Sequence, residues 1–307
     1  MSRKQGGLLA PLNLIPRGME EKEAKRHLLG IIDVGGGLRG AFTAGVYDYF
    51  LDRKIQPFDY LLGVSAGSAN MITYLSGQRG RNQKFYTEYA FRRQYMSAGN
   101  FLRRGSYIDL DYVYTTLSGP GGEDPVDLDA FNANPARYEA VVTDAATGQP
   151  LYFDKSELAQ GDFSVIKASC AVPGVCRPYP VHGRPGFDGG IADPVPYRHA
   201  LEQGCDRMVV LLTRPADFVR PPLDHPKMME RSMRRWPNAY AALKRRYIRY
   251  NQDVAEVKKL EEMGKALLVA PSDISGMSTL TRDKAVIQRL YRMGYDQGEK
   301  IERFTRW

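Results

Sequence analysis

Histidine and cysteine are both scarce in this chain of 307 residues. None of the four histidines has HxxxH or HExxH spacing, so we expect no metal site. The three cysteines, Cys170, Cys176 and Cys205, are an odd number without CxxC spacing, which argues against a disulfide framework. Such a chain fits a reducing compartment, and we expect a cytoplasmic location.

Long hydrophobic runs are also missing. The longest, such as residues 208–212, have the length of a strand and fall well short of the ~20 residues that a membrane span needs. Residues 1–26 contain acidic side chains and no long apolar segment, so we interpret them as a polar arm rather than a secretion signal. Hydrophobic residues make up 43% and charged residues 25% of the chain, which excludes disorder, collagen and coiled coil as descriptions of the whole.

Acidic residues are in the minority. Lysine and arginine number 43 against 35 aspartates and glutamates, a net charge of +8 that fits an anionic partner or serves solubility alone. Basic and aromatic residues are interleaved at 92–104 and 231–249. Such stretches either lie on an anionic membrane surface or are solvated helix faces. The sequence has no recognised nucleic-acid-binding motif, so we expect no nucleic acid partner.

Short apolar runs alternate with helical patterns along the chain. We expect strands at 28–34, 60–64, 138–143, 151–153, 207–213 and 266–270, and helices at 40–52, 66–75, 163–169, 196–203, 227–263 and 282–304, with a break at Pro237. This alternation predicts an α/β fold whose mostly parallel sheet carries helices on both faces. Residues 85–117 are rich in Tyr, Arg and Phe without a strand pattern, which favours an inserted lid or cap.

The strongest local motif is GVSAG at residues 63–67. It follows an apolar strand and precedes a helix, the context of a nucleophile elbow. Gly63 and Gly67 leave room for the sharp turn, and the helix N-terminus beside Ser65 favours a developing oxyanion. The motif therefore makes Ser65 the candidate nucleophile.

A second motif, GGGLRG, occupies residues 35–40 directly after the first strand. Consecutive glycines can turn backbone N–H groups toward an anion. A phosphate would indicate dinucleotide binding, for which Asp52 and Asp59 have suitable spacing. The oxyanion of acyl transfer is favoured instead, because a nucleophile elbow follows on the next strand.

The base that would activate the serine has two interpretations. A Ser–His–Asp triad would use His182, His199 or His225, and the order Ser65, Asp188, His199 matches an α/β-hydrolase. Alternatively, Asp188 acts directly on Ser65 in a dry pocket that strengthens it as a base. Taken alone, the segment DGG at 188–190 is also typical of a hairpin turn.

Together GGGLRG, GVSAG and DGG, with ASCAVP at 168–173 and VTD at 142–144, resemble the patatin-like phospholipase family over roughly residues 28–215. The resemblance is strongest to compact bacterial members. It implies a three-layer α/β/α fold, hydrolysis of lipid acyl esters, and a Ser–Asp dyad without histidine, metal or organic cofactor.

The resemblance assigns roles to the motif residues. Ser65 and Asp188 would be catalytic, the amides of Gly36, Gly37 and Leu38 would form the oxyanion hole, and the supporting residues would be Gly35, Arg39, Gly40, Gly63, Gly67, Gly189 and Gly190. Arg39 would shape its loop or attract a substrate phosphate.

We therefore expect three parts in the chain: the polar arm at 1–26, a catalytic domain at 27–273 and a C-terminal helical extension at 274–307 that packs on the same domain. The expected function is that of a phospholipase A-type lipid acyl hydrolase, peripheral at the inner face of the membrane if the basic stretches bind lipid. A small-ester or thioester hydrolase and a lipid-binding regulatory protein with little turnover stay open as alternatives.

Overall fold

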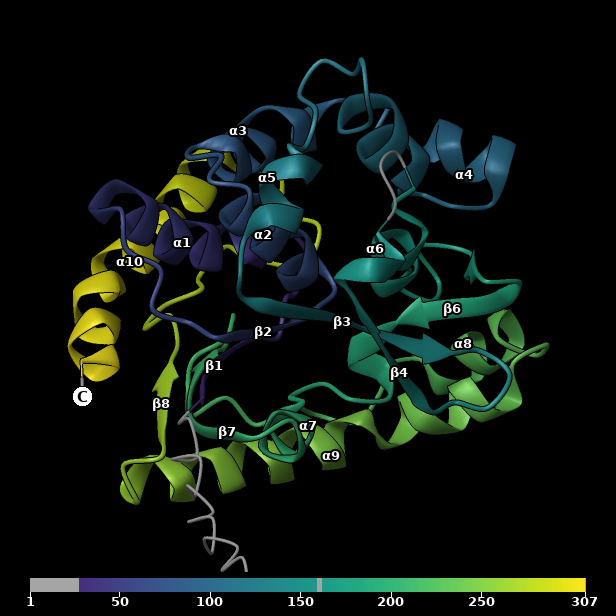
Figure 1. Cartoon of the computed structure of the whole chain (residues 1–307). Coiled ribbons are helices and arrows are strands. Elements are labelled where there is room, and N and C mark those ends of the chain that lie inside the picture. Colours follow the sequence, from purple (N-terminus) through teal and green to yellow (C-terminus); the bar gives the residue numbers. More distant parts are fainter. Residues whose placement is uncertain (1–27, 159–161, 307) are drawn as a thin grey trace, which may run out of the picture.

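One eight-stranded sheet forms the centre of the computed structural model, which describes residues 28–158 and 162–306 (Figure 1). The strands are β1 Leu28–Asp33, β2 Tyr60–Val64, β3 Arg137–Asp144, β4 Pro150–Asp154, β5 Tyr179–Val181, β6 Arg184–Asp188, β7 Cys205–Leu211 and β8 Ala266–Val269. The α-helices are α1 Ala41–Arg53, α2 Ala66–Leu75, α3 Arg81–Thr87, α4 Ala98–Arg104, α5 Leu128–Ala133, α6 Ser164–Ser169, α7 Tyr197–Glu202, α8 Pro226–Ser232, α9 Pro237–Glu262 and α10 Lys284–Thr305. The expected arm at 1–26 lies outside these residues.

The sheet is mostly parallel, as the alternating pattern predicts. Its order is β5-β6-β3-β2-β1-β7-β8, and β3, β2, β1, β7 and β8 each run parallel to the next. β4 and β6 pair antiparallel with β3, and β5 pairs antiparallel with β6. The chain moves outward from β1 to β3 and then returns to the other side of β1. The carboxyl end of β1 is therefore a topological switch point, where parallel α/β sheets bind ligands.

Helices cover both faces of this sheet, which gives three layers (Figure 1). On one face, Ile31 of β1 shares a buried cluster with Phe42 of α1, Met71 of α2 and residues of α10. On the other, Ile32 packs in a cluster that includes Val254 of α9. Because successive strand side chains point to opposite faces, one apolar strand supplies both cores.

The C-terminal helix α10 lies directly against α1. Tyr291 of α10 donates a hydrogen bond to the Asp48 carboxylate at 2.8 Å, and the Tyr49 hydroxyl donates to Glu302 at 2.7 Å. At the crossing, a Cβ added to Gly294 would lie 1.8 Å from the Phe42 carbonyl oxygen. The two backbones thus approach too closely for any larger residue.

The hairpin of β5 and β6 is an element that the sequence pattern does not predict. Pro180, Gly183, Pro185 and Gly186 are typical of a loop, yet β6 pairs with β3 at Val142–Asp188 and Thr143–Phe187.

The helix break expected at Pro237 in the long basic stretch is confirmed, since α8 ends at Ser232 and α9 begins at Pro237. Proline is tolerated there because the first turn of a helix has no partner for its N–H.

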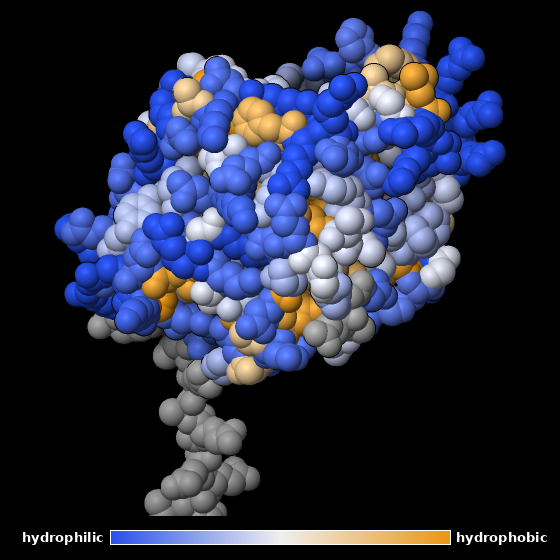
Figure 2. Space-filling view, turned by 90° about the horizontal axis from the view of Figure 1, so that it is seen from above, coloured by the Kyte–Doolittle hydropathy of each residue, from blue (hydrophilic) through white to orange (hydrophobic). Residues whose placement is uncertain are grey.

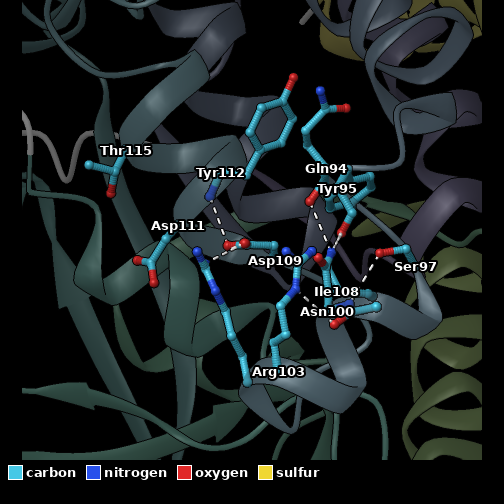
Figure 3. A network of polar contacts seen from close by, with 12 residues as sticks. Gln94, Tyr95, Ser97, Asn100, Arg103, Ile108, Asp109, Asp111, Tyr112 and Thr115 are labelled. Atoms are coloured by element: carbon cyan, nitrogen blue, oxygen red, sulfur yellow. Dashed lines mark hydrogen bonds and ion pairs between the residues drawn. The ribbon is translucent and has the colours of Figure 1, made fainter.

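Residues 85–117 contain the end of α3, all of α4 and short helical turns but none of the eight strands, and they lie beyond α2 and α6, away from the sheet (Figure 1). Polar contacts hold the segment together (Figure 3). The Asn100 side chain donates to the carbonyl of Gln94 at 3.0 Å, and the Tyr112 amide donates to the Asp109 carboxylate, also at 3.0 Å. In the part of the chain with described coordinates, no helix is long and apolar enough to cross a membrane.

Candidate active site

Four segments that follow or end strands meet at the switch point. The glycine loop follows β1, Ser65 follows β2, Asp188 ends β6, and the segment 212–214 follows β7. Ser65, Asp188 and Gly35 to Gly37 line one cavity of about 110 Å³. The structure thus brings together the two motifs and the DGG aspartate, which are far apart in the sequence.

Ser65 occupies a strained turn at the start of α2. Its φ of 55° and ψ of −130° lie outside the regions that L-residues ordinarily adopt. A Cβ at Gly63 would lie 2.4 Å from the Cα of Ser68, so only glycine permits this turn. The Ser65 amide donates to the Ser169 hydroxyl at 2.9 Å, and Ser169 in turn donates to the Val141 carbonyl at 2.7 Å. Ser169 lies in the ASCAVP segment, but sequence alone assigned it no role.

The glycine loop presents its amides beside Ser65. Gly35 has a φ of 62°, and a Cβ there would lie 2.1 Å from the Val64 carbonyl oxygen. Within residues 28–158 and 162–306, the amides of Gly36 and Gly37 have no hydrogen-bond acceptor. The Leu38 amide, in contrast, donates to the Thr279 carbonyl at 3.1 Å. Two of the three expected oxyanion donors are therefore available in this conformation.

Asp188 is almost completely buried, with 5% of its surface exposed. Burial raises its pKa above the ordinary value, while the positive charge of Arg246 and hydrogen bonding from the Ser65 hydroxyl lower it. The Gly190 amide donates to the Asp188 carboxylate at 2.9 Å. The carboxylate is therefore held beside the serine in a pocket where its basicity is increased.

The described histidines take no part in this constellation. His199 bonds Glu139 at 2.6 Å and stacks on Tyr152 with ring centroids 3.5 Å apart. His182 pairs with Glu157 at the surface, and His225 precedes α8. None of these three lines the Ser65 cavity, so the geometry does not assemble the Ser–His–Asp arrangement left open above.

Neither of the two aspartates with suitable spacing for dinucleotide binding lines the described part of this cavity. Asp52 pairs with Arg79 at 2.9 Å near the end of α1. Asp59 precedes β2 and accepts a hydrogen bond from the Leu29 amide at 2.9 Å. Both carboxylates lie away from the glycine loop, so neither supplies the acidic residue that dinucleotide binding requires there.

A family model described as patatin-like phospholipase matches residues 34–201. These residues are more than half of the chain and contain all three motifs. The chain belongs to the patatin-like phospholipase family. The match confirms both the resemblance carried by the motifs and the α/β fold with a mostly parallel sheet.

Several relatives share parts of this patatin-like chain. The protein YjjU of Escherichia coli (strain K12), itself uncharacterised, is 32% identical over 221 residues, which are 70% of this chain and 58% of YjjU. An uncharacterised NTE family protein of Mycobacterium tuberculosis is 44% identical over 170 residues, 52% of this chain and 42% of that protein. The chain thus spans about half the length of these relatives. A family model for a domain of unknown function matches residues 236–307.

Among solved structures, VipD from Legionella pneumophila has a TM-score of 0.44 and 14% identity to this chain. The comparison covers 90% of the chain and 67% of VipD.

Cys170 lines a cavity together with Ser65, the candidate nucleophile of this patatin-like protein. Burial raises the pKa of its thiol to about 12, and its sulfur lies 3.3 Å from the Tyr114 hydroxyl. A thiol with such a pKa is protonated at neutral pH and is a poor nucleophile. Its environment is that of a small packing group.

A second cavity, of about 40 Å³, also borders Ser65. Apolar and aromatic side chains make up most of its lining, among them Leu38, Tyr95, Met96, Ile108 and Leu110. Most of them come from the segment 85–117. That segment therefore supplies one wall of the space around Ser65.

Three arginines in the Ser65 cavity were not identified from the sequence as site residues. Arg214 follows β7, Arg220 lies in the loop before α8, and Arg246 lies on α9. The sequence pattern placed Arg246 with its neighbours on one basic helix face. In the structure Arg246 lines the cavity, and Arg249 donates to the Ala192 carbonyl, because a helix turns successive side chains in different directions.

Proposed function

We propose that the chain is a lipid acyl hydrolase in which Ser65 is the nucleophile and Asp188 is the general base. The observation that carries this proposal is one cavity lined by both Ser65 and the buried Asp188, beside two glycine amides that have no acceptor among the described residues. A carboxylate whose pKa is raised by burial accepts a serine proton more readily than one in water.

The reaction would proceed by acyl transfer. Asp188 takes the Ser65 proton as the hydroxyl oxygen attacks the ester carbonyl, and the amides of Gly36 and Gly37 stabilise the oxyanion. Asp188 then protonates the leaving alcohol and later activates the water that releases the acid. Leu38 joins the oxyanion hole only when the Thr279 carbonyl moves away from its amide.

The apolar cavity beside Ser65 favours a lipid ester over a small ester or a thioester. Its lining by Tyr95, Met96, Ile108 and Leu110 suits an acyl chain, because burial of hydrocarbon against such side chains stabilises the complex by about 25 cal/mol per Å². The intact dyad also disfavours a regulatory protein with little turnover.

The test of this proposal is covalent labelling by a fluorophosphonate probe, read by peptide mass spectrometry. We expect labelling at Ser65 and loss of both labelling and esterase activity in Ser65→Ala. Ser156→Ala, a change at an exposed serine outside the cavity lining, is the matched control and should label like the unmodified protein. Labelling at another serine, or full activity of Ser65→Ala, would contradict the proposal.

We further propose that the enzyme binds anionic bilayers peripherally through α4 and the α8–α9 junction. A groove of about 560 Å³ lies there, lined by Phe101, Arg234, Arg235 and Trp236 among others. Phe101 and Leu102 are 51% and 84% exposed. Seen from above, hydrophobic side chains form separate patches on a mostly hydrophilic face (Figure 2).

The charge of this surface and its position both support membrane binding there. Among the described residues, neither Arg234 nor Arg235 has a carboxylate within 4.0 Å. The groove also adjoins the catalytic cavity, because Pro173 and Phe187 line the groove while their neighbours Val172 and Asp188 line the cavity. A bilayer seated on the groove would therefore lie next to the dyad.

A further inference from the structure

Four arginines surround the space in front of the dyad. Arg39 comes from the turn after β1, Arg214 from the end of β7, Arg220 from the loop before α8 and Arg246 from α9, and all four line the cavity of about 110 Å³. Only Arg39 lies within residues 34–201, which the patatin-like family model matches. The other three are therefore additions to the family core, supplied by later parts of the chain.

Arg39 is buried and donates from Nη1 to the Thr279 hydroxyl at 3.1 Å, whereas the other three arginines are partly buried. Arg39 is 6% exposed. The Nε atoms of all four arginines are shielded from solvent and have no hydrogen-bond partner in the described part of the chain. Nor does any of the four have a carboxylate within 4.0 Å there. Buried polar groups are nearly always paired, so such a cluster of unmatched donors calls for an anion.

The cations also repel one another. Burial, together with the charges of Arg214 and Arg246, lowers the pKa of Arg39 to about 10. Burial and the nearby Arg246 lower the pKa of Arg220 to about 9. Asp188 is the carboxylate in the described lining, and one guanidinium is enough to balance it. The remaining positive charge has no carboxylate counterpart among the described lining residues.

The cavity's size limits where that counterpart can lie on a substrate. Ser65 and the arginines share about 110 Å³, so an anionic group bound by the arginines must be only a few bonds away from the ester that Ser65 attacks. The apolar cavity also borders Ser65, and its lining suits the acyl chain. An acyl ester of glycerol phosphate has this layout of hydrocarbon, ester and anion.

We propose that this pocket selects lipid esters whose headgroup is a phosphate monoester, held by Arg39, Arg214, Arg220 and Arg246. This proposal rests on the proposed hydrolase function and names the substrate class of the same site. A phosphate monoester carries a charge of about −1.5 to −2 at pH 7 and three acceptor oxygens, which the planar guanidinium fork binds in pairs. A choline phosphodiester has one negative charge, balanced by its own ammonium, and fits the cluster less well.

The first experiment compares three soluble substrates with the same acyl chains: dihexanoyl phosphatidate, dihexanoyl phosphatidylcholine and dihexanoylglycerol. We expect kcat/KM to be highest for phosphatidate by at least about tenfold, since charge-assisted hydrogen bonds are about twice as strong as neutral ones. Arg220→Gln should lower the phosphatidate-to-diacylglycerol ratio of kcat/KM by about 10- to 100-fold, and Arg220→Lys should lower it less. Arg245→Gln, the exposed neighbour of Arg246 on α9 and outside the cavity lining, should keep the ratio.

A second experiment separates the headgroup from the chemistry. Calorimetric titration of Ser65→Ala with dihexanoyl phosphatidate and with inorganic phosphate measures binding without turnover, and the same titrations follow in Ser65→Ala/Arg220→Gln. We expect the lipid to bind Ser65→Ala more tightly than inorganic phosphate does. Its affinity should fall by at least about tenfold in Ser65→Ala/Arg220→Gln.

Each outcome decides one of the two proposals. Ser65-dependent turnover with equal kcat/KM for the three lipids overturns the phosphate selectivity and leaves the hydrolase intact. Arginine-dependent lipid binding without turnover of any ester by the unmodified enzyme supports the phosphate site and overturns the hydrolase. Inorganic phosphate binding as tightly as the lipid, without a substrate preference, would show a site for free phosphate and overturn the headgroup assignment.

Discussion

Asp188 is subject to two opposing effects at the scale of a single residue. Burial favours its protonated form, whereas Arg246 and the Ser65 hydroxyl favour the carboxylate. Since burial is the larger effect, the pKa is raised, and the carboxylate becomes a stronger base than an exposed aspartate. Activity should accordingly decline as the pH falls through this raised pKa, because the base must be ionised to accept the serine proton.

Replacing the base tests the dyad directly. We expect Asp188→Asn to reduce kcat by about 10²–10⁴-fold, the usual effect of losing a general base. His182→Ala, His199→Ala and His225→Ala should each retain most of the activity, because these side chains do not line the cavity. Steady-state kinetics on a soluble short-chain ester gives the measurement. A histidine variant as inactive as Asp188→Asn would favour a triad.

Asp33 is a second buried carboxylate, below the glycine loop, and its titration affects stability. It is fully buried and accepts hydrogen bonds from the Gly35 amide at 2.9 Å and the Tyr47 hydroxyl at 3.3 Å. Burial raises its pKa to about 6, against about 3.9 in the unfolded chain. Between these values the folded state holds a proton that the unfolded state has lost. Its contribution to stability is therefore present below pH 4 and is lost as the pH rises to about 6.

We predict that Asp33→Asn removes this loss. Relative to the unmodified protein, the variant should gain up to about 3 kcal/mol in unfolding free energy between pH 4 and pH 7, since one pKa unit corresponds to 1.36 kcal/mol. Urea denaturation at the two pH values gives the comparison, with the exposed Asp296→Asn on α10 as control. An equal difference at both pH values would show that Asp33 does not titrate in this range.

At the scale of elements, the contact between α1 and α10 depends on missing side chains rather than on large ones. Gly294 faces the Phe42 carbonyl oxygen, and Gly45 of α1 faces the Tyr291 carbonyl oxygen, where a Cβ would lie 2.0 Å away. Backbone atoms cannot rotate aside, so neither position accepts a methyl group without a shift of the whole helix.

Gly294→Ala should therefore destabilise the protein by about 1–3 kcal/mol, even though alanine is the better helix former by about 1 kcal/mol. The exposed Lys300→Ala on the same helix should change stability by less than about 0.5 kcal/mol. Chemical denaturation of both variants tests this. A Gly294→Ala protein as stable as the unmodified one would mean that α10 does not pack this closely in solution.

At the scale of the whole molecule, the Ser65 cavity and the groove between α4 and the α8–α9 junction share a wall. Exposed apolar side chains, and arginines without a carboxylate within 4.0 Å in the described part of the chain, therefore lie beside Ser65 and Asp188. Attraction of arginines to an anionic surface amounts to about 1 kcal/mol each and is screened over about 8 Å at physiological salt.

We expect binding to anionic vesicles to weaken by about 2 kcal/mol in Arg234→Gln/Arg235→Gln and to weaken further as salt rises. Arg292→Gln/Arg303→Gln on α10 removes the same charge from another surface and should bind like the unmodified protein. Vesicle sedimentation measures the bound fraction of the unmodified protein and of both double variants. Equal binding by both double variants would show that Arg234 and Arg235 belong to a solvated helix face and do not bind the membrane.

The sequence by itself determined the class of fold, the family and the candidate dyad. Strand–helix alternation and three short motifs are local patterns, and GVSAG specifies its own turn because Gly63 and Ser65 are neighbours in the chain. Tertiary structure alone decided what surrounds Ser65. Arg220 and Arg246 line the Ser65 cavity from distant segments, and the Thr279 carbonyl accepts a hydrogen bond from the Leu38 amide. β6 forms because it pairs with the edge of β3. Such long-range contacts depend on how the layers pack, and no local pattern records that packing.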